Sequence, residues 1–369
     1  MKALVFPFDL LSHYLRCISF TKKFPERSYF FANSFSYSNY LKESEIETFE
    51  VRSFNAFEVM EKSEKFDFSW MNEEDLEKVF LSQVAVIQMQ KPDAVIGDMS
   101  PTLKMAAEYT NTKYESLLNG YMSPYYAGVR HVSRTHYSYN YVNKLPRKIG
   151  ERVTKIAEKF AFKEVHKPFR KLRKKYGLTN VYSYLNELEG DITYICDLPE
   201  LFPQRNLPNN YKFIGPLYNS YSPKIKNSVQ LVNNKPNILI TMGSSGSWQD
   251  LKFLNDTKYN EFQFIVAGDS KGQLNASHFL HYDFLNFDEI LPSSDIMICH
   301  GGNGTIYEGI RHKKYMLCLT RHFEQEWNAK RIEELGLGLV INDNPKQFID
   351  SYLFDKTPFV NENSISLSF

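Results

Sequence analysis

The chain has 369 residues, of which 43% are hydrophobic and 24% are charged, close to the average for a globular protein. At roughly 100–200 residues per domain, this length indicates two domains. The 44 Lys and Arg residues and the 43 Asp and Glu residues give a net charge of +1, which argues against a generally basic nucleic-acid-binding protein and against an acidic disordered tail. No stretch approaches the roughly 18 apolar residues of a transmembrane helix.

The cysteines and the first residues bear on the compartment. The four cysteines are scattered and include no C-x-x-C pair, which fits a reducing compartment and argues against a disulfide framework or a zinc site. The opening run MKALVFPFDLLSHYLR has one Lys at its head and an Asp inside a short apolar run. It is therefore a poor secretory signal and a good first strand, and we expect a cytoplasmic protein.

In the first half, short apolar runs alternate with longer helical patterns, which is typical of βαβ units and a parallel sheet. The pattern predicts strands at 2–8, 28–33 and 93–99, and helices at 12–24, 75–90 and 100–110. The helix at 100–110 is expected to begin with Ser100 as its N-cap and Pro101 as its first residue.

The segment 144–175 is strongly basic. It holds 13 Lys and Arg residues and three Glu residues, a net charge of +10. Val153, Ile156, Phe160 and Val165 fall near helical spacing within it, which predicts an amphipathic helix. A solvated charged face and a peripheral contact with an anionic membrane both fit this pattern. Nucleic acid is the least favoured partner, because no groove-reading motif accompanies the charge.

The periodicity stops at 214–227, where Pro, Asn and Ser residues give the composition of a linker. A second α/β series follows, with strands expected in NILIT, FQFIVAG, DIMIC and YMLCLT and a helix over 328–336 that ends at Gly336. We therefore predict an α/β protein with two doubly wound Rossmann-like domains, at 1–216 and 217–345, followed by a C-terminal tail at 346–369.

Two glycine-rich turns follow strands in the second half, and ligands of open parallel sheets bind beyond the strands' carboxyl ends. Gly243 and Ser244 form the first turn, which could bind a phosphate or serve only as a turn. The second runs from His300 into a helix and has three glycines in four positions, which indicates an anion site at a helix N-terminus. Thr305 and Glu308 also have the spacing of a capping box, which would give Glu308 a purely structural role.

Two further strand ends carry polar or aromatic residues. Glu324 and Gln325 could hold two neighbouring hydroxyls of a sugar, or could be solvated loop residues. The aromatic stretch 281–287 could seat a base, whereas His278 and His281 within or beside it are interpreted as surface residues and not as metal ligands. In the first half, His13 lies just past the first strand and Asp98 at the end of a buried strand. A histidine beside a carboxylate can act as a general base, although a structural histidine and a loop aspartate would give the same sequence.

The run 300–338 (HGGNGTIYEGIRHKKYMLCLTRHFEQEWNAKRIEELGLG) resembles the C-terminal signature of inverting nucleotide-sugar glycosyltransferases with the GT-B fold. That family includes UDP-glucuronosyltransferases, plant secondary-metabolite glycosyltransferases and bacterial macrolide and sterol glycosyltransferases. FLNFDEILPSSD, ILITMGSSG, LPNNYKFIGPL and PDAVIGDMSPTLKMAAEYTN extend the resemblance over about residues 1–340. It departs from the family at Ser12, where a Gly is usual, and at Asn286, where a Pro is usual, and it fades after 340.

The resemblance implies two domains facing a central cleft and a role for each matched residue. His13 would be the general base and Asp98 would orient it. The donor's diphosphate would be surrounded by His300, Gly301, Gly302, Asn303, Gly304 and Thr305, with Gly243 and Ser244 at the β-phosphate. Glu308 would hold the ribose, Leu285 and Phe287 would flank the base, and Glu324 and Gln325 would hold the sugar. The C-terminal tail of this family usually returns to the first domain.

The expected reaction is transfer of a hexose from a nucleotide diphosphate sugar, with a UDP-sugar as the expected donor, to a hydroxyl of a lipophilic or aromatic acceptor. The Tyr-dense stretch 121–141 suits such an acceptor, with Tyr121, Met122 and Tyr125 as expected contacts. No two aspartates are spaced as Asp-X-Asp, so we expect catalysis without a metal or other cofactor. A catalytically inactive nucleotide-sugar-binding partner protein and a nucleotide-sugar epimerase remain alternatives.

Overall fold

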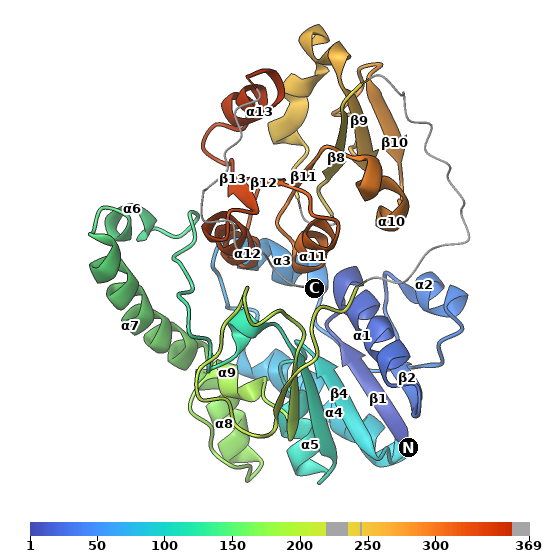
Figure 1. Ribbon diagram of the computed structural model, residues 1–369. Helices are drawn as coiled ribbons and strands as arrows, with labels where there is room; N and C mark the ends of the chain where they lie inside the picture. Colours follow the sequence, from blue (N-terminus) through green and yellow to red (C-terminus); the bar gives the residue numbers. More distant parts are fainter. Residues whose placement is uncertain (219–234, 244–245, 356–369) are drawn as a thin grey trace. The chain divides into compact units, whose positions relative to one another are not determined.

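The computed structural model describes residues 1–218, 235–243 and 246–355. The chain divides into two compact units, Met1–Asn219 and Ser220–Phe369, and each contains one parallel sheet accompanied by helices (Figure 1). The predicted boundary, between 216 and 217, lies close to this division. The predicted class, α/β with two doubly wound sheets, is confirmed. Within the described parts of the chain, no helix combines the length and the apolar character that crossing a bilayer would require.

The first unit is built on seven parallel strands in the order β3-β2-β1-β4-β5-β6-β7. They are β1 (Lys2–Pro7), β2 (Ser28–Ala32), β3 (Thr48–Phe49), β4 (Ala94–Asp98), β5 (Lys113–Leu118), β6 (Ile192–Ile195) and β7 (Tyr211–Phe213). β1 and β4 are neighbours, so the strand order reverses between them, and Pro7 is aligned with Asp98 where both strands end. Such a reversal is the place where open α/β sheets bind ligands. Both strands are buried along almost their whole length, which explains their continuous apolar sequences.

Nine α-helices belong to the described part of the first unit. They are α1 (Leu11–Lys23), α2 (Ser38–Glu43), α3 (Ala56–Glu64), α4 (Glu73–Gln90), α5 (Leu103–Tyr109), α6 (Tyr139–Val142), α7 (Arg147–Val165), α8 (Lys167–Lys175) and α9 (Tyr184–Glu187). The start of helix α4 is determined by its local sequence. The Asn72 side chain accepts a hydrogen bond from the backbone N–H of Asp75, and three acidic residues in the first turn favour the positive end of the helix dipole.

Helix α5 begins later than the sequence predicts. It starts at Leu103 with Thr102 at the N-cap, so Ser100 and Pro101 lie in the preceding turn. The reason is a long-range contact. Gln83 of α4 donates to the Ser100 hydroxyl at 3.2 Å and accepts from the Thr102 hydroxyl at 2.8 Å. Because both hydroxyls are bonded to Gln83, neither caps the helix, and local sequence cannot reveal such a partner.

A buried ion-pair network fixes the junction of α7 and α8. The Arg173 guanidinium donates to both carboxylate oxygens of Glu187, at 2.7 and 2.6 Å, and to Glu108 at 2.6 Å. His166, at the turn between the two helices, contacts Glu187 at 2.7 Å. Arg173, Glu187 and His166 are all buried. The basic segment predicted over 144–175 is therefore not wholly a solvated surface, because Arg173 is buried and pairs with Glu187 and Glu108.

The second unit repeats the same topology with six parallel strands in the order β10-β9-β8-β11-β12-β13. They are β8 (Asn237–Thr241), β9 (Gln263–Ala267), β10 (Phe279–Tyr282), β11 (Ile296–Cys299), β12 (Met316–Cys318) and β13 (Gly338–Val340). The helices are α10 (Phe287–Ile290), α11 (Asn303–Arg311), α12 (Phe323–Glu334) and α13 (Pro345–Phe354). The strand order reverses between β8 and β11, whose ends Thr241 and Cys299 are aligned.

Helix α13 belongs to the second unit, although the sequence predicts a separate tail from 346 onward. Ile349 is fully buried in the core of this unit, and the Tyr352 ring stacks on Tyr315 with centroids 5.8 Å apart. The Phe354 ring meets Phe262 edge to face at 5.4 Å. The remainder of the predicted tail, 356–369, lies outside the described residues.

Truncation of Ile349 should destabilise the second unit. Replacing this fully buried side chain by Ala should lower the free energy of unfolding by about 2–5 kcal/mol, because the transfer free energy is lost and a cavity remains. Denaturant unfolding can be followed through Trp248 and Trp327 of the second unit in a Trp70→Phe background. The exposed Gln347→Ala is the control and should change stability by about 0.5 kcal/mol or less. Equal effects of the two substitutions would contradict the assignment of α13 to this core.

Candidate active site

Four of the predicted site residues lie at the two points where strand order reverses. In the first unit, His13 follows β1 on α1 and Asp98 ends β4. In the second unit, Gly243 follows β8 and His300 follows β11. In each unit the two residues come from neighbouring strands, so the topology brings them together although they are far apart in sequence.

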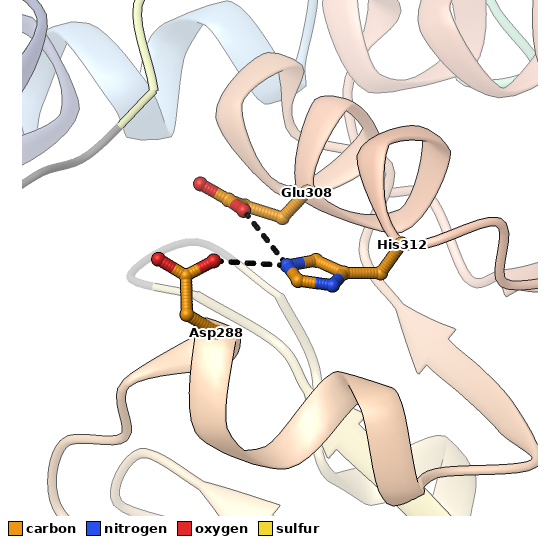
Figure 2. Close-up of side chains that lie close together, drawn as sticks. All are labelled: Asp288, Glu308 and His312. Carbon is orange, nitrogen blue, oxygen red and sulfur yellow. Dashed lines mark hydrogen bonds and ion pairs between the residues drawn. The ribbon is translucent and has the colours of Figure 1, made fainter.

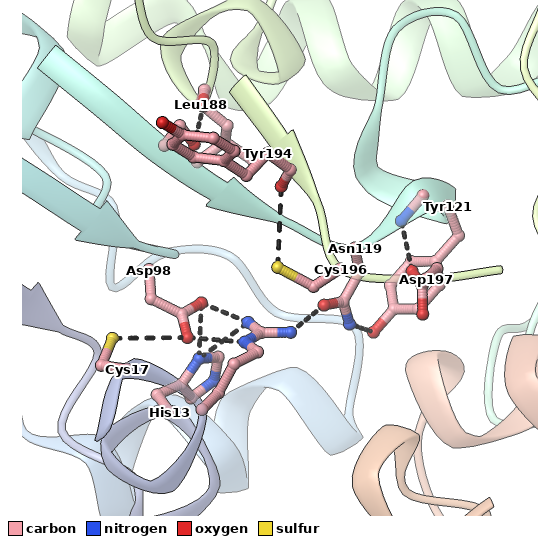
Figure 3. A network of polar contacts seen from close by, with 12 residues as sticks. His13, Cys17, Asp98, Asn119, Tyr121, Leu188, Tyr194, Cys196 and Asp197 are labelled. Carbon is pink, nitrogen blue, oxygen red and sulfur yellow. Dashed lines mark hydrogen bonds and ion pairs between the residues drawn. The ribbon is translucent and has the colours of Figure 1, made fainter. Parts of the chain in front are cut away.

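The His13 ring is paired with the Asp98 carboxylate (Figure 3). His13 Nδ1 lies 3.0 Å from Asp98 Oδ1; the His13 side chain is 16% exposed and that of Asp98 is fully buried. An ionised carboxylate can only accept hydrogen bonds, so a neutral ring that bonds Asp98 through Nδ1 carries its proton there and has Nε2 as the acceptor nitrogen. The Phe8 ring meets the imidazole edge to face at 5.9 Å. The pair thus has the geometry of a base held by an orienting carboxylate.

Arg16 is a third member of this group that the sequence analysis missed. Its Nε donates to Asp98 Oδ2 at 2.7 Å, its Nη2 contacts Asp98 Oδ1, and Nη2 also lies 3.2 Å from His13 Nδ1. Its Nη1 donates to the Asn119 side chain just past β5. The signal available in the sequence was spacing, because Arg16 follows His13 by three residues on the same helix and therefore shares its face.

The charge of Asp98 is fixed by these neighbours. Burial alone would raise the pKa of the carboxyl, but Arg16 and His13 stabilise the ionised form and together hold the pKa at about 2. Asp98 is therefore a carboxylate throughout the neutral range. The Cys17 thiol lies 3.9 Å from Asp98 Oδ2, and burial next to this negative charge raises its pKa well above the usual value. The thiol is therefore protonated beside Asp98.

The residues predicted to contact an acceptor are placed differently from expectation. Tyr121 and Met122 lie in a 3₁₀ turn, η1 (Gly120–Met122), and are only 1% and 4% exposed. The Tyr121 hydroxyl accepts from the Asn119 amide, so Tyr121 extends the polar network of Asp98 (Figure 3). Tyr125 is partly exposed, with its ring against Tyr211 at 5.2 Å. Of the three, only Tyr125 offers partly exposed side-chain surface.

Glycine is required in both turns of the second unit because the His300 ring fills the space between them. Gly243 has φ +52°, and a Cβ there would lie 2.6 Å from His300 Cε1. A Cβ on Gly302 would lie 2.3 Å from His300 Nε2. Gly301 has φ +80°, and its Cβ would meet the Gln325 carbonyl oxygen at 3.0 Å. Side chains are thus excluded where backbone amides line the turn. Ser244 lies outside the described residues.

Helix α11 begins at Asn303 and its N-cap, Gly302, has no side chain to cap it. Its first turn, which contains Asn303, Gly304 and Thr305, therefore presents backbone N–H groups at the positive end of the helix dipole. The capping-box interpretation of Thr305 and Glu308 is wrong, because Thr305 lies inside the helix and not at its N-cap. The turn keeps the geometry of an anion site.

Glu308 lies in a cluster of charged side chains on α10 and α11. Arg311 donates to Glu308 Oε2 from Nη2 at 2.8 Å and also contacts Asp288. His312 Nε2 is 3.0 Å from Asp288 and 4.0 Å from Glu308 (Figure 2). Among the described residues, one group has possible metal-ligand atoms that all lie within 4.8 Å of one another, and it consists of Asp288, Glu308 and His312. The Arg311 guanidinium already pairs with both carboxylates, which disfavours a cation at this place.

The predicted sugar-binding pair lies in the first turn of α12 and not in a loop. Helix α12 starts at Phe323, so Glu324 and Gln325 are helical. Gln325 is buried, and its Oε1 accepts from the Arg321 backbone N–H at 2.8 Å. Asn328, one turn later, donates to the Gly301 carbonyl at 3.0 Å. This contact ties α12 to the glycine turn, and Asn328 is a second residue that the sequence analysis missed.

The remaining predicted donor contacts lie at the end of β10. Leu285 is buried and Phe287, the first residue of α10, is partly exposed. Asn286 between them is the N-cap of α10, where its side chain accepts from the Asp288 backbone N–H at 3.0 Å. An Asn is suited to this position because its side chain can cap a helix, which explains the residue found where the family usually has Pro.

The two histidines near the glycine turns are uncharged at neutral pH. Burial lowers the pKa of His300 to about 4, and burial with the neighbouring His300 lowers the pKa of His322 to about 3. The buried Nδ1 of His300 has no hydrogen-bond partner in the described part of the chain. A neutral imidazole with a buried polar atom left over can bind a ligand atom that enters the turn.

Acidification should destabilise the second unit through these two histidines. Their pKa values in the folded state lie below the unfolded value of about 6.5, so the unfolded state binds more protons between about pH 6.5 and 4. The free energy of unfolding should therefore fall as the pH is lowered across this window, by at most roughly 1.4 kcal/mol per pH unit for each histidine. Denaturant unfolding at several pH values, followed through Trp248 and Trp327, measures it.

The matched comparison uses His300→Asn, His322→Asn and the exposed His281→Asn. The first two should reduce the slope of stability against pH, and His281→Asn should leave it unchanged. Slopes that are equal in all three variants and the parent would contradict the buried, neutral state of His300 and His322.

Residues 219–351 match the family described as Glycosyltransferase family 28 C-terminal domain. Among curated proteins, the chain is similar to a PGL/p-HBAD biosynthesis glycosyltransferase of Mycobacterium tuberculosis, with 26% identity over 293 residues. The match covers 73% of this chain and 64% of that relative, so this chain corresponds to less than two thirds of the relative's length.

Solved structures show the same fold. The glycosyltransferase VinC in complex with dTDP superposes with a TM-score of 0.63 at 16% identity, covering 96% of this chain and 92% of that one. The spinosyn rhamnosyltransferase SpnG complexed with spinosyn aglycone gives a TM-score of 0.66 at 13% identity, covering 94% and 88%. The resemblance predicted from the sequence is confirmed: the chain has the GT-B fold, and its second unit is similar to the C-terminal domain of glycosyltransferase family 28.

Proposed function

We propose that this protein transfers a hexose unit from a nucleoside diphosphate sugar to a hydroxyl group of a lipophilic or aromatic acceptor, with inversion at the anomeric carbon. The observation that carries the proposal is the pair of strand-order reversals. One supplies an imidazole oriented by a buried carboxylate, and the other supplies an uncapped helix N-terminus beside a buried neutral imidazole. These are the two groups that such a transfer needs, a base and a site for an anionic leaving group.

The donor is proposed to bind the second unit. Its diphosphate would accept hydrogen bonds from the backbone amides in the first turn of α11. The His300 ring would lie beside these amides, in the space that Gly243 leaves open. Glu308 would hold the ribose, Leu285 and Phe287 would flank the base, and Glu324 and Gln325 would contact the sugar. Because Gln325 Oε1 accepts from Arg321, a hydrogen bond from Gln325 to a sugar would come from its amide nitrogen.

The base is proposed to be Nε2 of His13. As the acceptor oxygen attacks the anomeric carbon, Nε2 removes its proton, and the nucleoside diphosphate leaves from the opposite side of the sugar, which inverts the configuration. Asp98 stabilises the imidazolium that forms and keeps Nδ1–H pointing toward itself. Arg16 holds Asp98 in place and belongs to the positioning residues.

Charge on the leaving diphosphate is proposed to be stabilised by the helix dipole and amides of α11, so that no divalent ion is required. The dTDP bound to VinC supports a TDP-sugar as a second candidate donor beside UDP-sugars. The aglycone bound to SpnG supports a small-molecule acceptor. An apolar acceptor is favoured by the aromatic content of 121–141, in which Tyr125 is partly exposed.

A donor and acceptor screen tests the proposal directly. The purified protein is incubated with UDP-sugars and TDP-sugars, with and without phenols, sterols, hydroxylated lipids and free sugars, and release of nucleoside diphosphate is measured. We expect release that depends on an apolar acceptor and that persists in excess chelator. Loss of activity in chelator with recovery on adding Mg²⁺ or Mn²⁺ would contradict the metal-free account, and turnover of free sugars alone would contradict the acceptor class.

The same screen separates the alternatives. A nucleotide-sugar epimerase would convert the donor sugar into an isomer of the same mass without any acceptor. Such an isomer would be detected by chromatography of the nucleotide sugar. An inactive partner protein would bind nucleotide but release no diphosphate with any acceptor. The intact pairing of His13 with Asp98 favours the transferase over an inactive partner protein, because such a protein requires no base.

Removal of His13 should lower the rate without weakening donor binding. His13→Ala should reduce kcat by roughly 10²–10⁴-fold, since proton transfer to a positioned base contributes about that factor. Its affinity for UDP or TDP, measured by calorimetry, should stay close to that of the parent, because His13 belongs to the other unit. Glu308→Gln should show the converse, weaker nucleotide binding. Lys22→Ala, an exposed substitution near the other end of α1, should change neither quantity, and a comparable rate loss in this control would overturn the assignment.

A further inference from the structure

Helix α7 carries an exposed apolar stripe. Ile149, Val153, Ile156 and Phe160 are 49%, 41%, 59% and 65% exposed, respectively. Their spacing of four, three and four residues places all four on one face of the helix. The predicted fourth apolar residue, Val165, is only partly exposed, and Ile149 takes its place in the stripe. Four large apolar side chains in a row on one helix face are more than the scattered exposed residues of an ordinary surface.

The orientation of the stripe is fixed by contacts that the helix makes away from the stripe. Gly150 and Thr154 are buried, and the Thr154 hydroxyl donates to the Gly150 carbonyl at 2.8 Å. Glu158 pairs with the buried Arg130, which also donates to the Ser123 carbonyl at 2.7 Å. At its carboxyl end, α7 is held by the buried contact of His166 with Glu187. The helix cannot rotate to bury the stripe without breaking these contacts.

Basic side chains line one flank of the stripe. All of these residues are exposed, and none forms an ion pair with a carboxylate in the part of the chain that the structure describes. They are Lys148, Arg152, Lys155, Lys159 and Lys163. At 100° per residue, they project between about 50° and 130° from the centre of the stripe. None of the three carboxylates of the helix lies on this flank, and Glu151 is paired with Arg147, Glu158 with Arg130 and Glu164 with Lys167. The face is therefore apolar in the middle and cationic along one side.

The apolar surface continues toward the amino end of α7. Leu145 is 38% exposed just before the helix, and Tyr141 of α6 and the preceding Tyr137 are 74% and 85% exposed. In Figure 1 the two helices follow one another in the green part of the first unit. Tyrosine rings have an apolar body and a polar edge, which suits them to the boundary between lipid and water.

We propose that this face of α7 and α6 is a docking surface for an anionic lipid bilayer. The helix would lie in the plane of the interface, with the stripe in the acyl boundary and the basic flank at the headgroups. Long basic side chains reach headgroups while their stems stay on apolar surface. A second copy of this chain is disfavoured as the occupant, because two such faces would oppose net positive charge to net positive charge. The proposal stands independently of the proposed reaction.

Co-flotation with vesicles tests the docking surface. The full chain is mixed with vesicles of phosphatidylcholine alone or of phosphatidylcholine with phosphatidylglycerol, at low and high salt. We expect binding to the anionic vesicles that falls at high salt. A variant with Gln at all five basic positions of the flank should bind at least about tenfold more weakly. A second variant, Ile156→Ser with Phe160→Ser, should also bind more weakly, although its charge is unchanged.

Matched controls carry the same substitutions on other exposed positions. Gln replaces the exposed lysines Lys42, Lys212, Lys252, Lys271 and Lys313 in one control, and Phe57→Ser with Met89→Ser forms the other. Both should bind as the parent does, and circular dichroism verifies that every variant is folded. Equal binding of parent and flank variant, equal binding to neutral and anionic vesicles, or no binding of the parent to either would overturn the proposal. So would a dimer in sedimentation velocity that the stripe variant abolishes.

Discussion

The buried charge of Asp98 is the interaction on which the first unit's site depends. A fully buried carboxylate is costly unless charged or hydrogen-bonding partners surround it. Here Arg16 and His13 come from α1, and Asn119, at the end of β5, holds the far side of the Arg16 guanidinium. The same contacts thus satisfy the carboxylate, fix the helix against the sheet and set the direction of the imidazole. Orientation of the His13 imidazole and stability of the fold cannot be separated at this point.

The glycine turns of the second unit contain no charged side chain, so these turns have no buried charge of that kind to stabilise. Gly243, Gly301 and Gly302 clear the space around the His300 ring, and burial keeps that ring neutral. Asn328 then fastens α12 to the carbonyl of Gly301. Because the groups proposed to bind the anion are backbone amides, they need no change of protonation state to receive a negatively charged ligand. One topology therefore holds the proposed proton acceptor in one unit and the proposed anion site in the other.

The sequence predicted the features that depend on local pattern. The buried parallel strands and the residues at their ends follow from apolar runs and glycine turns. The late start of α5 could not be predicted, because the Ser100 and Thr102 hydroxyls are hydrogen-bonded to Gln83, which lies on α4. The Tyr121 ring likewise packs against Phe202, at 5.1 Å between centroids, and Arg16 is held by Asn119, which is 103 residues away in sequence. Partners across the sheet decide such details, and spacing alone does not identify them.

The pairing of Asp98 with Arg16 restricts the path of the proton in the proposed reaction. A carboxyl whose pKa is held at about 2 stays ionised and cannot store a proton that leaves the imidazole. The guanidinium beside it accepts none, and the nearby Cys17 is already protonated. No protein relay leads inward from His13 through these groups. Each proton taken from an acceptor must therefore depart outward, through the exposed part of the His13 ring, to water, buffer or the departing product.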